Sequence, residues 1–137
     1  MKSVVDTNVL VSSFLSPRGV RAKVIQAWQN QQFELVVSEA ILTEYERALN
    51  YQKVSSRHSL NPKQVGQVIA EMKSFAIVVK PKHKLTVIKD DPDDNKFLEA
   101  ALEAGAEYII SADPHLLKVE QYQGIQILSA SEFLLVI

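Results

Sequence analysis

The sequence predicts an α/β protein, with a three-layer α/β/α arrangement around a central, mostly parallel, five-stranded sheet. Short apolar runs, typical of buried strands, alternate with segments whose apolar residues recur every three or four positions, as in helices. Strands separated by helices need crossover connections, which make the strands parallel and put helices on both faces. The 137 residues, 47% hydrophobic and 23% charged, suit one globular unit, so we expect a single domain over residues 1–137.

The first part of the chain contains two predicted strands, each followed by helical spacing. Residues 3–5 form the first strand, which ends at Asp6. Two helical segments follow, and we interpret Trp28 in the second of them as a core anchor. Residues 33–37 form the second strand, after which Ser38 caps a helix. The apolar face of that helix consists of Ile41, Leu42, Tyr45, Ala48 and Leu49.

The middle of the chain is less regular. Residues 51–60 are polar and weakly patterned, and we expect no more than a short helix there. Asn61 and Pro62 begin a clear helix. Residues 76–79 form the third predicted strand, and residues 85–88 a brief extended piece that leads into an acidic stretch.

The acidic stretch opens the next helix and has four aspartates within five residues: Asp90, Asp91, Asp93 and Asp94. We interpret Asp91 as the N-cap, Pro92 as the first helical residue and Gly105 as the end. Carboxylates at a helix N-terminus are stabilising without any further function. Asp94 differs, because helical spacing puts it in line with the apolar face of this helix. We therefore expect Asp94 at the rim of the sheet.

The last part of the chain completes the sheet. Residues 108–110 form the fourth predicted strand and residues 125–128 the fifth. Ser129 and Glu132 have the spacing of a capping box, which predicts a short final helix.

Charge, cysteine content and hydropathy exclude several classes of function. The formal net charge of −1 provides no overall basic field. The absence of cysteine excludes disulfides and thiolate chemistry and suits a reducing compartment, so we expect a cytoplasmic protein. No apolar run approaches the roughly 20 residues that span a bilayer, and residues 1–5 do not have the layout of a signal peptide. We therefore expect no membrane association.

Four acidic residues are placed to meet at one edge of the predicted sheet. Ligands of parallel sheets bind beyond the carboxyl ends of the strands, where the strand order reverses. Asp6 ends the first strand and Asp113 follows the fourth, so their carboxylates face each other if these strands are neighbours. Asp94 reaches this edge if its loop folds over, and Glu44 could approach from its helix. Singly, each also fits a simpler explanation, such as a turn starter or a surface glutamate.

Four segments resemble the motifs of PIN-domain ribonucleases, in the same order and over essentially the whole chain. They are Val4-Val5-Asp6-Thr7-Asn8-Val9-Leu10, Ser38-Glu-Ala-Ile-Leu-Thr-Glu44, Asp94-Asn-Lys-Phe-Leu-Glu-Ala-Ala and Ser111-Ala-Asp113. The resemblance implies a PIN-like fold and a metal-dependent endoribonuclease that hydrolyses phosphodiester bonds in single-stranded RNA. It also implies the toxin of a toxin–antitoxin pair, or a stand-alone relative. The candidate partners are therefore an RNA substrate, an antitoxin protein and a second copy in a homodimer.

The resemblance implies a catalytic, metal-binding set of four residues: Asp6, Glu44, Asp94 and Asp113. Two carboxylates about 4 Å apart repel by about 4 kcal/mol at an effective dielectric constant of about 20. A hard cation with oxygen ligands, Mg²⁺ or Mn²⁺, would neutralise them. We expect polar neighbours to order water around such ligands, and we interpret the lone His115 as structural or exposed. Those neighbours are Thr7, Asn8 and Ser111.

Two alternatives remain at this point. One is a phosphatase of the haloacid dehalogenase class with Asp6 as nucleophile, although its signature has a second aspartate where this chain has Asn8. The other is a non-catalytic PIN-like binding module. If RNA is the ligand, its phosphates need cations in an acidic protein. The candidates are Arg47, Arg57, Lys80, Lys82 and Lys84.

Overall fold

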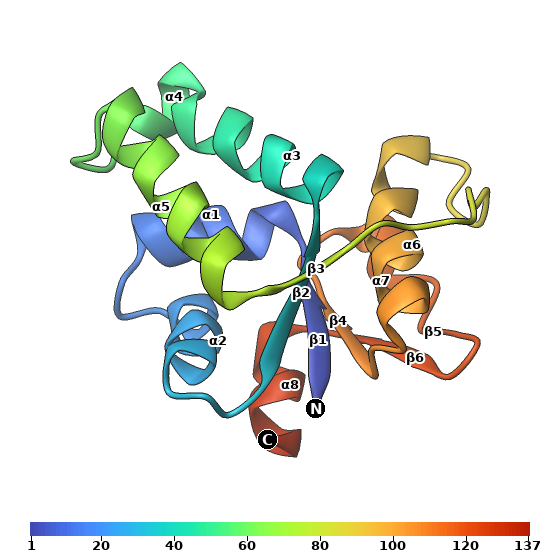
Figure 1. The fold of residues 1–137 in the computed structure, drawn as a ribbon. Coiled ribbons are helices and arrows are strands. Elements are labelled where there is room, and N and C mark those ends of the chain that lie inside the picture. The colour runs from blue at the N-terminus through green and yellow to red at the C-terminus, as the bar shows by residue number, and fades with distance from the viewer.

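The structure is a computed structural model that describes residues 1–137, and it is organised around one six-stranded sheet (Figure 1). The strand order is β3-β2-β1-β4-β6-β5, and every pairing is parallel except that of β5 with β6. The strands are β1 (Lys2–Val5), β2 (Glu34–Ser38), β3 (Ile77–Val79), β4 (Tyr108–Ile110), β5 (Gln121–Tyr122) and β6 (Ile125–Leu128). The predicted mostly parallel α/β sheet is confirmed.

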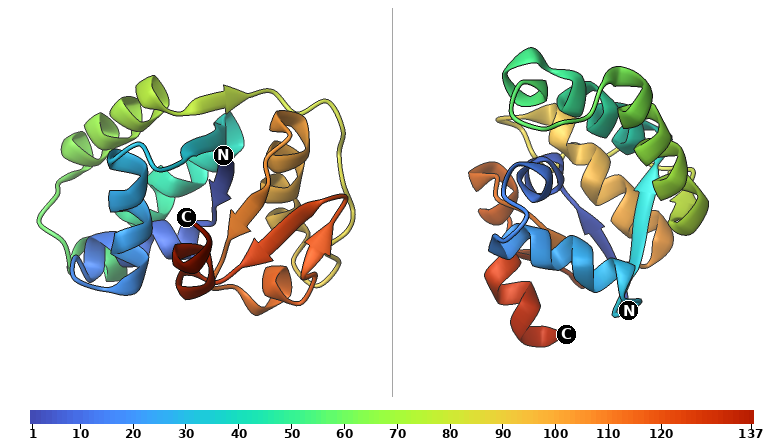
Figure 2. Two further views of the ribbon diagram at one scale, coloured as in Figure 1. Left: turned by 90° about the horizontal axis from the view of Figure 1, so that it is seen from below. Right: turned by 90° about the vertical axis from the view of Figure 1, so that its left-hand side faces the viewer.

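Helices cover both faces of the sheet (Figure 2). On one face α6 packs against β1, β2, β3 and β4, and on the other α8 packs against β6 and α2. The helices are α1 (Thr7–Leu15), α2 (Val20–Gln29), α3 (Glu39–Asn50), α4 (Gln52–Ser55), α5 (Pro62–Phe75), α6 (Asn95–Ala104), α7 (Pro114–Leu117) and α8 (Ala130–Val136). None of them has both the length and the apolar composition needed to cross a membrane. The predicted three-layer arrangement is confirmed.

The two central strands lie at the heart of the core. Val4 and Val5 of β1, and Ile109 and Ile110 of β4, are fully buried, as expected of parallel strands covered on both faces. One cluster of 27 buried residues surrounds them, and Trp28 packs against this cluster as the predicted core anchor.

The sixth strand is a difference from the predicted five. Gln123 and Gly124 have φ angles of 47° and 84°, which is the backbone of a two-residue hairpin turn. The turn lets β5 pair antiparallel with β6 at the edge of the sheet. A strand of two residues shows no alternation of polar and apolar positions, so periodicity could not reveal it.

The start of α6 also differs from the prediction. Pro92–Asp94 form a 3₁₀ turn, η1, and the α-helix begins three residues later than predicted, at Asn95. Asp91 precedes this turn, but its side chain makes no capping hydrogen bond. The side-chain amide of Asn95 instead donates to the carbonyls of Ile88 and Pro92, both at 2.9 Å, and so draws the preceding segment over the helix end.

Residues 80–91 connect β3 to η1 and run alongside α6, to which hydrogen bonds hold them. The backbone N–H groups of Lys82, Leu85 and Ile88 donate to Glu103, Glu99 and Asn95 at 2.8, 2.8 and 2.9 Å. These three acceptors are four residues apart, so they lie on one face of α6. The extended piece predicted at 85–88 therefore joins no strand and bonds to the helix instead. Its path delivers Asp91 and Asp94 to the carboxyl edge of the sheet.

Candidate active site

The site is built where β1 and β4 lie side by side. Val5 is paired with Ile110, and the backbone N–H of Asp6 donates to the carbonyl of Ile110 at 2.9 Å. The strand order reverses between these two strands, because β2 lies on the other side of β1 and β6 on the other side of β4. The residues that follow β1 and β4 therefore meet in the crevice where parallel sheets bind ligands.

Asp6 is fixed at this edge by three hydrogen bonds and is only 2% exposed. Its Oδ1 accepts from the backbone N–H of Val9 at 3.0 Å and thereby caps α1. Its Oδ2 accepts from the backbone N–H of Ala112 at 3.1 Å and from the hydroxyl of Ser111. Burial raises the pKa of Asp6 although these hydrogen bonds favour its ionised form. The carboxyl group therefore joins α1 to the end of β4 with a fixed orientation.

Asp94 is the most perturbed carboxyl group of the site. Its Oδ2 atom is buried and has no hydrogen-bond partner. Burial raises the pKa of Asp94 to about 8, and Asp113, Asp91 and Asp6 add to the shift. The neighbouring Asp94 carboxyl group and a hydrogen bond from the backbone N–H of His115 lower the pKa of Asp113. Of the two carboxyl groups, Asp94 therefore keeps its proton to the higher pH.

Four side chains form a group whose chemistry fits a divalent cation. One ligand atom from each lies within 4.8 Å of the others, and the residues are Asp91, Asp94, Asp113 and His115. Three carboxylates and one imidazole, with no thiolate, are the donors of a hard or borderline cation such as Mg²⁺ or Mn²⁺. The unpartnered oxygen of Asp94 is the observation that favours a ligand here, because a buried acceptor without a donor is costly.

Glu44 is held beside this group by contacts of its own. The buried hydroxyl of Tyr45 donates to the carbonyl of Val5 and so fastens α3 to the end of β1. The Oε2 atom of Glu44 accepts a hydrogen bond from the hydroxyl of Thr7. Its Oε1 atom forms an ion pair with Nζ of Lys96, 2.6 Å away. Lys96 also lies 2.9 Å from Asp93, and its side chain is only 12% exposed. Both oxygens of Glu44 are thus engaged.

The structure therefore divides the predicted ligand set. Asp6, Asp94 and Asp113 gather at the edge of β1 and β4, whereas Glu44 is paired with Lys96. Of the predicted polar neighbours, Ser111 contacts Asp6 and Thr7 contacts Glu44. Asn8 is exposed and makes no side-chain hydrogen bond.

Three residues of this region have no site role in the sequence prediction, which makes Asp91 a helix N-cap and His115 structural or exposed, and does not include Lys96. The structure places His115 against Asp113, with 3.6 Å between Nδ1 and Oδ1, although its side chain is 45% exposed. Spacing offered a weak signal, because Asp91 lies three residues before Asp94 and His115 two after Asp113. No pattern in the sequence indicated that Lys96 pairs with a residue on another helix.

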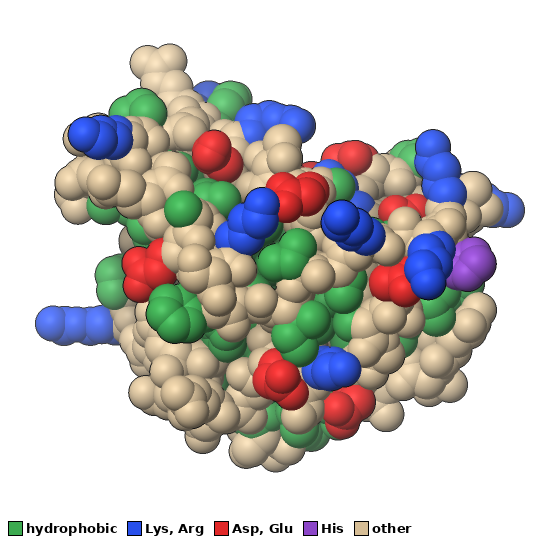
Figure 3. Space-filling model, viewed as in Figure 1, with side chains coloured by type: hydrophobic (Ala, Val, Ile, Leu, Met, Phe, Trp, Pro, Cys, Tyr) green, Lys and Arg blue, Asp and Glu red, His purple; other side chains and the backbone are tan.

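The predicted RNA-binding cations are all exposed but do not form one surface. Arg47 on α3 and Lys84 face the same groove, which lies beside Lys96. Lys80 and Lys82 precede that groove, and Arg57 lies beyond α4; none of these three lines it. Acidic and basic side chains are interspersed over the face that carries α3 and α6 (Figure 3).

Known proteins resemble this chain in sequence and in fold. The chain is 27% identical over 122 residues to the uncharacterized protein MJ1680 of Methanocaldococcus jannaschii, over 87% of this chain and 75% of that protein. Its fold is similar to that of a chain in VapBC-1 from nontypeable Haemophilus influenzae, with a TM-score of 0.62, 15% identity and coverage of 96% and 99%. A chain of VapBC2 from Rickettsia felis, bound to a promoter DNA fragment, matches with a TM-score of 0.59, 12% identity and coverage of 93% and 97%.

The family is identified by sequence. The PIN domain profile matches residues 2–115, which contain every acidic residue of the site described above and His115. The edge of β1 and β4, where Asp6, Asp94 and Asp113 converge, lies wholly inside the matched region. The chain therefore belongs to the PIN domain family.

Proposed function

We propose that this protein is a metal-dependent endoribonuclease that hydrolyses phosphodiester bonds in single-stranded RNA. The observation that carries the proposal is the buried, unpartnered Oδ2 of Asp94, surrounded by carboxylates at the ligand-binding edge of a PIN domain. A surface cluster that only capped a helix would leave its oxygens in water. A group of acids with a buried member whose pKa is raised instead favours a site that a cation completes.

Asp91, Asp94, Asp113 and His115 would hold the cation, Mg²⁺ or Mn²⁺, with Asp6 adding negative charge next to them. When bound, such a cation acidifies a water molecule and neutralises charge that develops on the phosphodiester. The protein residues supply orientation. The hydroxyl of Ser111 donates to Asp6 and accepts from the backbone N–H of Asp113 at 2.9 Å, so it links the carboxylate of Asp6 to the backbone of Asp113.

Lys96 and Glu44 would act on the substrate side of the site. The hydroxyl of Thr7 orients Glu44, and Glu44 in turn orients the ammonium group of Lys96. Lys96 is therefore a fixed positive charge next to the acidic group, where a scissile phosphate could bind. The phosphatase alternative has less support, because Asp6 is only 2% exposed and both of its oxygens are engaged in hydrogen bonds within the protein, which leaves little access for a substrate.

We further propose that the chain is the toxin of a toxin–antitoxin pair and acts in the cytoplasm. The support is the similarity of its fold to chains of two VapBC structures. The cognate antitoxin would be encoded next to it, so co-expression of the two reading frames and co-purification of their products tests this part. A single species of the size of one chain, with no co-purifying product, would favour a stand-alone nuclease. A species of twice that size would favour a homodimer.

The nuclease itself is tested by cleavage of single-stranded RNA in Mn²⁺ and in EDTA. Wild type should cleave only with the metal, and Asp94→Asn should lower the rate by orders of magnitude. Asp90→Asn is the matched control, because Asp90 belongs to the same acidic stretch but is exposed and outside the ligand group. Cleavage that persists in EDTA, or in an Asp6→Asn/Asp94→Asn double variant, would indicate a contaminating enzyme. A correctly metallated but inactive wild type would favour a non-catalytic binding module.

A further inference from the structure

A basic groove of about 690 Å³ opens beside the acidic site, between α3, residues 84–92 and the start of α6. Its polar lining includes four cations, Arg47, Lys84, Lys89 and Lys96, and two hydroxyl groups, Thr43 and Thr86. Figure 3 shows several basic side chains over α6 and the segment that leads into it, with acidic side chains among them. The chain as a whole has 15 Lys and Arg against 16 Asp and Glu, so this grouping runs against the overall charge.

Three of the four cations are available to a ligand. Arg47, Lys84 and Lys89 are exposed, have no carboxylate within 4.0 Å and make no side-chain hydrogen bond. The acids that line the same groove are engaged otherwise. Asp93 is paired with Lys96, and Glu99 accepts the backbone N–H of Leu85.

The groove is presented on fixed backbone. The hydrogen bonds from Leu85 to Glu99 and from Ile88 to Asn95 hold the segment that carries Lys84 and Lys89 against α6. Positions held in advance lose less entropy when a ligand binds. Within this segment, only the side chains of the two lysines need to order.

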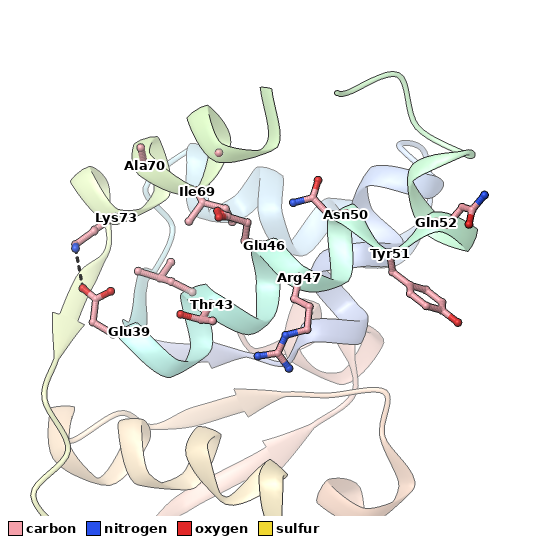
Figure 4. Close-up of a pocket in the computed structure, with 12 residues that line it drawn as sticks. Glu39, Thr43, Glu46, Arg47, Asn50, Tyr51, Gln52, Ile69, Ala70 and Lys73 are labelled. Carbon is pink, nitrogen blue, oxygen red and sulfur yellow. Dashed lines mark ion pairs between the residues drawn. The ribbon is translucent and has the colours of Figure 1, made fainter. Parts of the chain in front are cut away.

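Arg47 enters the groove from the opposite wall. In Figure 4 it projects from the side of α3 that faces away from α5, whereas Glu46 and Asn50 point toward α5. A neighbouring hollow of about 810 Å³ between α3 and α5 shares Thr43 and Arg47 with the groove. The lysine of that hollow, Lys73, is already paired with Glu39 at 2.7 Å, so of these two hollows only the groove has lysines without an ion-pair partner.

We propose that this groove binds the phosphate backbone of the RNA strand that flanks the cleaved bond. The strand would pass between Arg47 on one side and Lys84 and Lys89 on the other, and reach the acidic site at Lys96, which lies in the groove and contacts Glu44. The identity of the ligand as RNA rests on the proposed function. No aromatic side chain lines the groove, so it offers no stacking surface and would accept any sequence.

Binding without cleavage tests the groove directly. Fluorescence anisotropy with a labelled 12-nucleotide oligouridylate in EDTA would compare wild type, Lys84→Gln/Lys89→Gln and Lys23→Gln/Lys63→Gln. The control pair removes the same charge from exposed positions outside the groove. The groove pair should bind about tenfold more weakly, and the slope of log K against log salt should fall by about 1.4 for two lost phosphate contacts. The control should stay close to wild type, and all three proteins should melt at similar temperatures.

Two outcomes would overturn the proposal that the groove binds RNA. One is an equal loss of RNA affinity in both variant pairs, and the other is no loss of affinity in the groove pair. Cleavage in Mn²⁺, measured on the same proteins, separates this inference from the nuclease. A wild type that binds RNA through the groove but cleaves none would refute the nuclease proposal and support the groove proposal. An active wild type whose KM is unchanged in Lys84→Gln/Lys89→Gln would refute the groove proposal and support the nuclease proposal. If both hold, the groove pair raises KM much more than it lowers kcat.

Discussion

The Nζ atom of Lys96 lies 2.6 Å from Oε1 of Glu44, so one carboxylate of the predicted ligand set already forms an ion pair with a lysine. The pair joins α3 to α6 across the mouth of the site, and both side chains are less than one-fifth exposed. Glu44 and Asp93 raise the pKa of Lys96 against the effect of its burial, so the lysine is charged. Glu44 is thus engaged with Lys96, outside the group that Asp91, Asp94, Asp113 and His115 form.

Removing the charge of Lys96 should destabilise the metal-free protein. Lys96→Gln leaves Glu44 partly buried with Thr7 as its remaining partner, and the expected loss is on the order of 1–2 kcal/mol in the free energy of unfolding. Lys96→Arg keeps the charge and should lose less. Urea denaturation in EDTA measures both. A Lys96→Gln protein as stable as wild type would mean that the ion pair contributes nothing to the fold.

Neutralising Asp94 should do the opposite. At pH 7.5 the folded, metal-free protein keeps Asp94 largely protonated, whereas the unfolded chain ionises it, and this difference favours unfolding. Asp94→Asn removes the titrating group, so the metal-free melting temperature at pH 7.5 should rise. Millimolar Mn²⁺ should stabilise wild type by mass action and the variant less, because a ligand is missing. Calorimetry with EDTA and with Mn²⁺ measures the melting temperatures of both proteins. A variant that is less stable without metal and equally stabilised by it would reduce Asp94 to a residue of the helix start.

The metal-free protein should lose stability as the pH rises from about 5 to 8. Asp94 has a folded-state pKa of about 8 against an ordinary value of 3.8, so the folded protein holds this proton more tightly than the unfolded chain. The resulting stabilisation is complete below pH 3.8 and is lost as the pH rises toward 8. Asp6, whose pKa is also raised, acts in the same direction. The lowered pKa of Asp113 acts only below about pH 4, outside this window.

Melting temperatures recorded in EDTA across this pH range check the effect. Wild type should show a decline that Asp94→Asn reduces, because asparagine does not titrate. Saturating Mn²⁺ should flatten the wild-type profile, since a bound cation favours the ionised carboxylate. Parallel profiles for wild type and Asp94→Asn in EDTA would contradict the raised pKa.

Ser111 should matter for both stability and cleavage, because its hydroxyl links Asp6 to the backbone of Asp113. Ser111→Ala removes a hydrogen bond to a buried carboxylate and should lower the free energy of unfolding by about 1–3 kcal/mol. It should also lower kcat more than it raises KM, since the lost contact orients a carboxylate rather than the substrate. Ser111→Thr, which keeps the hydroxyl, is the control. Equal kinetics in both variants would assign Ser111 to packing alone.

Most of the architecture could be predicted from the sequence, because it depends on short-range regularities. The apolar runs at 3–5 and 108–110 and the helical spacing before Gly105 record local backbone geometry, one residue after another. They were sufficient for a mostly parallel sheet with helices on both faces, and for Asp6 and Asp113 at the ends of two strands. Helical backbone begins at Pro92 as predicted, but its first turn is 3₁₀ and the side chain of Asp91 does not cap it. Spacing alone did not show this, because the side chain of Asn95 bonds to the carbonyls of residues 88 and 92 and sets the path of the chain before α6.

The contacts of the site were decided by the tertiary structure. Ser111 meets Asp6 from 105 positions away, and Lys96 meets Glu44 from 52. Periodicity states which way a side chain points from its own element, but not which element lies opposite. The pairing of Glu44 with Lys96, and the grouping of Asp91 and His115 with Asp94, depend on how β1 lies beside β4 and how residues 80–91 fold along α6. The sequence by itself therefore determined that Asp6 and Asp113 follow two buried strands, and the packing of distant segments decided which other side chains gather beside them.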